Sequence, residues 1–226
     1  MRRSLVVSFA LLAIVRAPAV AQTCMGLASF KNAPMQVAGN GSFTSGVNRF
    51  GGTVGYGMPV GVWGKAAFST TSIDGAPSSS LGFGAHAGYQ KALNSGKAEL
   101  CPNASFTIGN GPDDDAAGIN GSSRLATVGL NFGTVMGTNP RMKFVPTLGL
   151  AYAHAKNQAK DDTGTTLFEI SDSYGLAQLG VGLVLNSNIS VRPSVDIPLG
   201  LDGADPSFGI TLGYNFGGSH APAPRR

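Results

Sequence analysis

Large hydrophobic side chains occupy every second position in the last apolar stretch of the chain, and small or polar residues fill the gaps. The large side chains are Phe208, Ile210, Leu212, Tyr214 and Phe216. Successive side chains of a β-strand point to opposite faces, so this stretch predicts a strand with one apolar face and one small, polar face. Such a strand suits a wall between lipid and a lumen.

The same alternation recurs in ten segments. They are residues 35–43, 50–58, 62–69, 81–90, 99–108, 126–133, 147–152, 178–185, 189–197 and 208–216. Most are near the roughly 9 to 11 residues that a tilted strand needs to cross a bilayer. Pro102 lies inside the fifth segment and cannot donate a ladder hydrogen bond, so we expect a bulge or a weak strand start there.

The connections between these segments alternate in length and charge. Connections after the odd segments include the long loops, interpreted as residues 109–123 and 157–172, and carry most of the acidic residues. Within the second loop, Leu167, Phe168 and Ile170 could extend the eighth strand beyond the bilayer. We predict an all-β fold, an antiparallel up-and-down transmembrane β-barrel with ten strands (eight as the alternative) and periplasmic short turns.

The amino terminus has the three regions of a secretory signal peptide, which are basic residues 1–3, apolar residues 5–15 and small residues 19–21. We expect cleavage after Ala21. The expected domains are a signal peptide at residues 1–21, a periplasmic lead-in at 22–34, the barrel at 35–216 and a short periplasmic tail at 217–226.

The basic charge of the chain comes mostly from this leader. Removing Arg2, Arg3 and Arg16 from the 16 Lys and Arg residues leaves 13 against 12 Asp and Glu residues. No cluster of basic residues with interleaved aromatics remains, so we expect no nucleic-acid partner.

Residues 35–216 resemble the small single-chain barrels of the OmpA/OmpX type, or outer-membrane β-barrel domain, of Gram-negative bacteria. Phe216 with an aromatic two residues earlier resembles the C-terminal strand that the barrel-assembly machinery reads in that family, and the implied signal is Phe208, Tyr214 and Phe216. The resemblance implies a porin-like protein of the cell outer membrane, in contact with outer-membrane lipids and lipopolysaccharide. We expect a monomer without a cofactor.

Cys24 and Cys101 are the two thiols of the chain, and an exported protein meets an oxidising compartment. A disulfide across the periplasmic mouth is therefore the favoured interpretation. A lipid anchor on Cys24 is disfavoured because no small residue directly precedes it. A metal site with distant histidines is weaker still, so we expect no metal.

A set of charged and polar side chains falls on the face predicted to line the lumen. The set is Lys65, His86, Gln90, Glu99, Arg192 and Asp196. Because buried charges need partners, we predict a polar network that fills a narrow barrel. We expect Lys65, Glu99 and Arg192 near the periplasmic mouth and a contact between His86 and Asp196 across the lumen.

These observations favour an outer-membrane barrel with a structural, surface-exposed or limited-permeability role. A small-solute pore is the alternative, and an outer-membrane enzyme or a soluble lipocalin-like binding barrel is less favoured. His154 precedes Asp161 and Asp162 at the predicted extracellular rim, but it falls on the lipid-facing side without a Ser-His-acid spacing. We therefore expect no catalytic residue. Asp113 to Asp115 lack the spacing of an EF-hand and are interpreted as a solvated loop.

Overall fold

The computed structural model describes residues 23–30, 33–76, 78–93, 97–111, 113–114, 118–137, 139 and 141–217. The predicted signal peptide, Asp115 and residues 218–226 of the tail lie outside the described residues. Within the described part, no helix is long and apolar enough to span a membrane.

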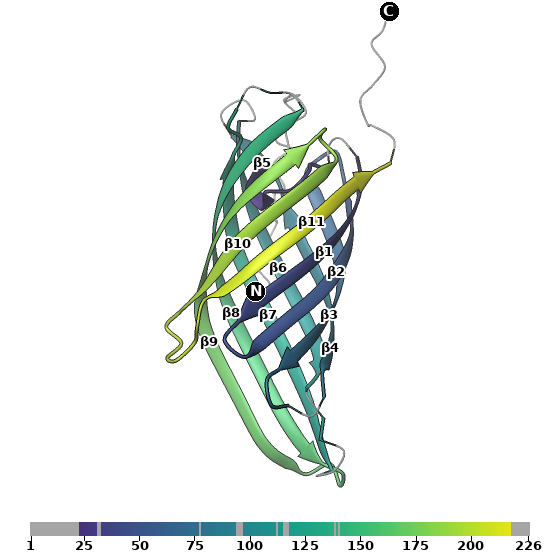
Figure 1. The fold of residues 1–226 in the computed structure, drawn as a ribbon, viewed down its shortest axis with the longest axis vertical. Coiled ribbons are helices and arrows are strands. Elements are labelled where there is room, and N and C mark those ends of the chain that lie inside the picture. Colours follow the sequence, from purple (N-terminus) through teal and green to yellow (C-terminus); the bar gives the residue numbers. More distant parts are fainter. Residues whose placement is uncertain are drawn as a thin grey trace, which may run out of the picture.

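The strands form a closed antiparallel barrel (Figure 1). After a short 3₁₀ helix, η1 (Thr23–Met25), the strands are β1 (Met35–Thr44), β2 (Val47–Gly57), β3 (Val62–Ile73), β4 (Ser80–Tyr89), β5 (Lys91–Leu93), β6 (Ala98–Asn110), β7 (Ile119–Thr134), β8 (Met142–Asp161), β9 (Thr166–Leu185), β10 (Ile189–Leu199) and β11 (Ser207–Phe216). Strands that are consecutive in sequence pair with each other, except that β4 and β5 both pair with β6, and β1 pairs with β11 to close the wall.

The barrel has ten strands because β4 and β5 are two parts of one strand. Both pair with β6, with Gly88 opposite Asn103 and Lys91 opposite Leu100, so the register does not change between them. The prediction of ten strands is confirmed, and the eight-strand alternative is wrong.

Of the two features expected at Pro102, the bulge is wrong, but strand pairing is interrupted at this residue on one side of β6. Pro102 pairs with Leu130 of β7 in an unbroken register. The interruption falls instead on its other side, where the ladder skips Tyr89 and Gln90, and Gln90 N donates to Gly61 O at 2.9 Å. A proline that lacks an N–H can interrupt one of its two ladders without an extra residue entering either strand.

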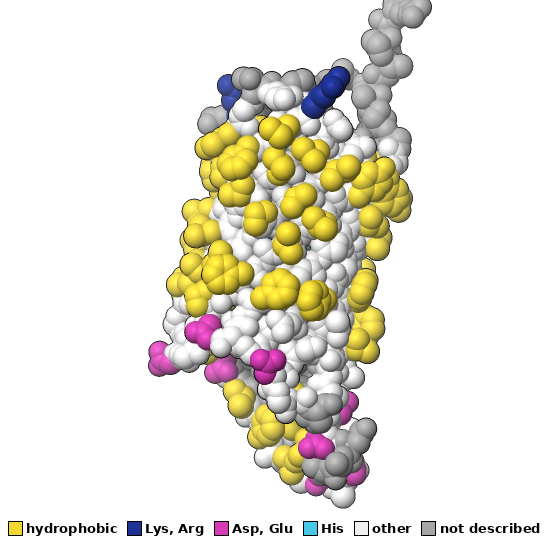
Figure 2. All heavy atoms as spheres, viewed as in Figure 1, with side chains coloured by type: hydrophobic (Ala, Val, Ile, Leu, Met, Phe, Trp, Pro, Cys, Tyr) yellow, Lys and Arg dark blue, Asp and Glu magenta, His cyan; other side chains and the backbone are white. Residues whose placement is uncertain are grey.

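An apolar belt surrounds the barrel (Figure 2). Large side chains on the outward face remain exposed, up to 63% for Phe83 and 62% for Phe208. Most inward positions carry small or polar residues, as the alternation predicted, and Trp63, Val145 and Val184 are larger apolar residues that are buried inside the wall. So much exposed apolar surface would be unfavourable in water, and its arrangement as a band is typical of a barrel that contacts lipid.

β7, β8 and β9 are longer than the sequence predicted. β8 and β9 each have 20 residues, and the hairpin that they form, with β7 paired to β8 as far as Asp161, extends past the remaining strands at the lower end of Figure 1. Most of residues 157–172 are therefore strand, not loop. The suggested extension at Leu167, Phe168 and Ile170 is confirmed.

On the face drawn in Figure 2, the charges visible at the two ends of the barrel are opposite. Figure 2 shows acidic side chains at the end where the β8–β9 hairpin projects and basic side chains at the other. Short turns join the strands at the basic end. Asn186 and Ser187 adopt positive φ values of 48° and 64° in the turn between β9 and β10, which matches the right-handed twist of two paired strands.

Candidate functional site

The segment before β1 lies inside one mouth of the barrel. In Figure 1 η1 lies inside the barrel near its upper end, where it contacts β6, β7 and β8. Ala28, Ser29 and Phe30 are at most 1% exposed, and Ala28 packs against Val145 and Val184 on the inner wall. We call residues 24–30 the plug segment. The sequence predicted a lead-in at 22–34 and did not place it within the lumen.

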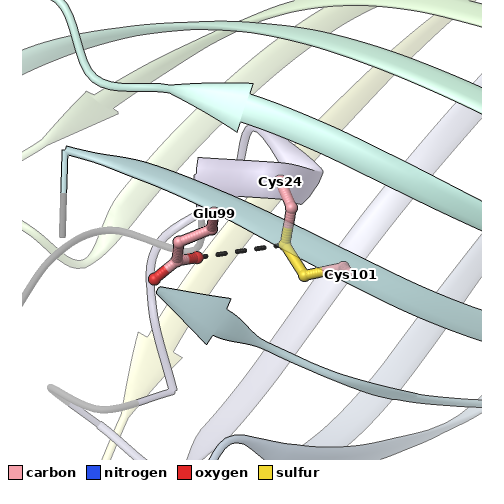
Figure 3. A group of neighbouring side chains, drawn as sticks. All are labelled: Cys24, Glu99 and Cys101. Atoms are coloured by element: carbon pink, nitrogen blue, oxygen red, sulfur yellow. Dashed lines mark hydrogen bonds between the residues drawn. A yellow bond between two sulfur atoms is a disulfide. The ribbon is translucent and has the colours of Figure 1, made fainter. Parts of the chain in front are cut away.

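A disulfide fixes the plug segment to the wall. Cys24 in η1 is bonded to Cys101 on β6, with their Cα atoms 5.8 Å apart, so the predicted disulfide is confirmed (Figure 3). Glu99 Oε2 lies 3.9 Å from Cys24 Sγ. The two sulfurs and this carboxylate lie within 4.8 Å of one another, but the disulfide removes both thiolates that a metal ion would need.

Buried amides hold the middle of the plug segment against the seam between β1 and β11. Gln36 and Asn215 face each other across this seam, and Gln36 Nε2 donates to Asn215 Oδ1 at 2.7 Å. Both side chains also donate to Ala28 O at 3.3 Å. Asn215 Nδ2 further donates to Ala33 O at 3.4 Å. The plug segment and the closing seam therefore share one hydrogen-bond network.

Lys65 joins this network from β3. Its ammonium donates to Gln36 Oε1 at 2.7 Å and lies 5.6 Å from the ring centre of Phe30 and 5.4 Å from that of Trp63. Aromatic faces attract a cation most strongly where water is excluded. Lys65 is thus held by an amide and two rings, an arrangement that the sequence reasoning did not anticipate.

Glycines on the wall make room for the plug segment. A Cβ on Gly182 would collide with the backbone of Gly26, and a Cβ on Gly57 would collide with Phe30. Arg192 lies over Gly26 and Gly180, and the Asn131 amide donates to the Met25 sulfur at 3.2 Å. The wall and the plug segment are complementary in shape.

The other predicted lumenal residues are arranged differently from the prediction. Lys65 and His86 are directly opposite each other on β3 and β4, not at different depths. Among the described residues, no hydrogen bond or ion pair joins His86 to Asp196, and Asp196 Oδ1 instead accepts from Gln178 at 3.1 Å. Gln90 is buried at the break between β4 and β5.

The titratable residues considered at the predicted extracellular rim each make a contact of their own. His154 is exposed on the outer face with its Nδ1 2.9 Å from Ser173 Oγ. Asp161 is used at the hairpin tip, where its Oδ1 accepts hydrogen bonds from Thr163 and Thr165. Asp113 Oδ1 accepts a hydrogen bond from Gly121 N at 2.9 Å, so this carboxylate stabilises the connection between β6 and β7.

The predicted assembly signal lies on the outside of β11. Phe208 and Tyr214 are exposed on the lipid-facing side, and the rings of Tyr214 and Phe216 stack with centroids 6.1 Å apart. Recognition of these side chains by the assembly machinery stays a prediction.

No protein-family model and no curated protein matches this sequence. Among solved structures, the chain is similar to the β domain of the Bordetella autotransporter BrkA, with 11% identity, a TM-score of 0.51, and coverage of 82% of this chain and 99% of that one. The translocator domain of autotransporter NalP from Neisseria meningitidis has 14% identity and a TM-score of 0.49, with 82% and 89% coverage. The KdgM porin has 12% identity and a TM-score of 0.42, with 80% and 99% coverage. At these identities the likeness establishes the fold alone.

Proposed function

We propose that this chain, which has the fold of the outer-membrane β-barrel proteins, is an integral outer-membrane protein with a structural or surface-exposed role and a lumen closed at its periplasmic mouth. The observation that carries this proposal is the plug segment, whose Ala28, Ser29 and Phe30 are buried inside the wall. A permanently filled mouth is incompatible with steady passage of solutes.

The orientation of the barrel follows from its turns and charges. Short turns of outer-membrane barrels are periplasmic and longer loops are extracellular. The plug segment lies at the end with the short turns, and the acidic β8–β9 hairpin lies at the other. The proposed closure is therefore on the periplasmic side, and the proposed surface-exposed part is the hairpin.

The alternative is a pore for small solutes. It is supported by the half of the lumen beyond the plug segment, where inward positions such as Ser194, Thr211 and Ser105 carry small polar side chains that water can reach. A plug segment that left the mouth would open a polar channel.

Single-channel recordings in planar bilayers distinguish the two functions. We expect no steady conductance from the mature protein, and open steps from a variant that lacks residues 23–33. A Cys24→Ser variant, which keeps the plug segment but frees it from β6, is expected to show brief openings. Steady conductance from the wild-type protein would instead establish the pore. Membrane fractionation with a heat-modifiable gel shift tests the location, since a soluble barrel would remain in the supernatant.

A further inference from the structure

One side of β9 has no neighbour along the part of the strand that projects from the barrel. β10 pairs with β9 only as far as Leu199 opposite Gly175, whereas β8 accompanies β9 on to Thr166. No other strand of the described chain pairs with residues 166–174 on that side. Such an edge presents unpaired backbone N–H and C=O groups, which are ready to pair with another strand.

Apolar side chains line this free edge outside the apolar belt. Phe168 and Ile170 are on the same face of β9 and are 53% and 52% exposed. In Figure 2, hydrophobic side chains on the projecting hairpin are separated from the belt by acidic groups. Contact with the bilayer therefore does not explain them, and exposed apolar groups beside a free edge indicate a protein-binding surface.

The charges beside the free edge are acidic. Asp172 lies on β9 itself, and Asp202 and Asp205 are in the loop that follows β10. The carboxylate of Glu169 is paired at 2.7 Å with Nζ of Lys156, which is on β8, the strand that pairs with the opposite edge of β9. Two copies of this chain would bring like charges together, whereas a basic partner would be attracted.

We propose that the free edge of β9, residues 166–174, binds an extended basic segment of another polypeptide as an added strand. The backbone of that segment pairs with the edge, its apolar side chains cover Phe168 and Ile170, and its Lys or Arg side chains lie near Asp172, Asp202 and Asp205. Main-chain bonds supply affinity in this mode, and alternate side chains supply specificity.

The test uses the mature protein in nanodiscs and a fluorescent peptide of alternating valine and lysine as the probe. Fluorescence anisotropy should show binding that weakens as salt is added, because exposed charges are screened. A valine–glutamate peptide and a valine–lysine peptide interrupted by proline should bind at least about tenfold more weakly. Equal binding of the proline-interrupted peptide would overturn the added strand, since charge alone would then explain the affinity.

Two variants locate the binding surface. Ile170→Lys should weaken binding about tenfold, because it replaces an apolar contact with a repelling charge. Ser79→Lys adds the same charge at an exposed position in the loop between β3 and β4, away from the edge, and should bind like the wild type. A heat-modifiable gel shift confirms that both variants are folded. Unchanged binding by Ile170→Lys would overturn the proposal, as would dimerisation of the wild-type protein that Ile170→Lys abolishes.

Discussion

Gln36 Nε2 donates a 2.7 Å hydrogen bond to Asn215 Oδ1, which joins the first strand of the barrel to the last across 179 residues of sequence. Both side chains are fully buried, and both also hold Ala28 of the plug segment. Closure of the wall and placement of the plug segment therefore depend on the same two amides.

Replacing Asn215 with leucine should destabilise the barrel. Asn215→Leu removes the acceptor of one Gln36 N–H and the amide that donates to Ala33 O, and each buried unsatisfied group costs about 1–3 kcal/mol. Urea unfolding in detergent, followed by the gel shift of the folded barrel, measures the loss. Asn40→Leu is the matched control because Asn40 is on the same face of β1 but is partly exposed. Equal losses in the two variants would contradict a special role for the seam amides.

Removing the disulfide should reduce stability without changing the fold. The bond spans 77 residues, and closing a loop of that size in the unfolded chain is worth about 4.5 kcal/mol in the chain-entropy account. The double variant Cys24→Ser, Cys101→Ser should therefore unfold at lower urea than the oxidised wild type. Adding reductant should lower the urea midpoint of the wild type to that of the double variant and should leave the midpoint of the variant unchanged. A reductant-insensitive wild type would contradict the prediction.

The sequence allowed prediction of the barrel itself because lipid imposes a strict rule on every strand that crosses it. Phe208, Ile210 and Leu212 must face outward, so the residues between them must face inward, and the strand count follows. The rule ends where the bilayer ends. Most of residues 157–172 are exposed on both faces and lose the alternation, so their pattern indicates a loop although most of them are strand.

The plug segment left a weaker signal in the sequence. Cys24 and Cys101 indicated that the lead-in is tied near the mouth, but Ala28 and Phe30 belong to no periodic pattern that could place them inside the wall. Gln36 and Asn215 are polar residues on the inner faces of the first and last strands. Their pairing could have been inferred from closure of the barrel, but their contacts with Ala28 required the structure.

The Asp161 carboxyl group at the hairpin tip should have an unusually low pKa. The Thr163 hydroxyl, followed by the Thr165 N–H, donates to Asp161 and holds the pKa of that carboxyl below its usual 3.8. These hydrogen bonds stabilise the tip above the usual value and are lost as pH falls through the lowered pKa.

NMR titration of the Asp161 carboxyl in nanodiscs measures this effect. Thr163→Val should raise the pKa of Asp161 toward 3.8, because the largest stabilising hydrogen bond is removed. Thr166→Val is the control, since the Thr166 hydroxyl accepts from Gln158 and does not contact Asp161. The prediction is wrong if Thr163→Val titrates like the wild type.

A single methyl group at position 57 should displace the plug segment. The Cβ of Gly57→Ala would collide with Phe30, and overpacking of this kind costs about 1–3 kcal/mol. The wall is held by continuous strand pairing, whereas the plug segment is held by fewer contacts. The strain should therefore be relieved by movement of Phe30 away from β2. Gly64→Ala is the matched control, since its nearest neighbour would be His86 O at 3.8 Å. We expect Gly57→Ala to keep the folded gel shift, to unfold at lower urea, and to show faster hydrogen exchange at residues 26–30 than Gly64→Ala. If exchange in the plug segment were the same in both variants, Phe30 would not be held by the close fit against Gly57.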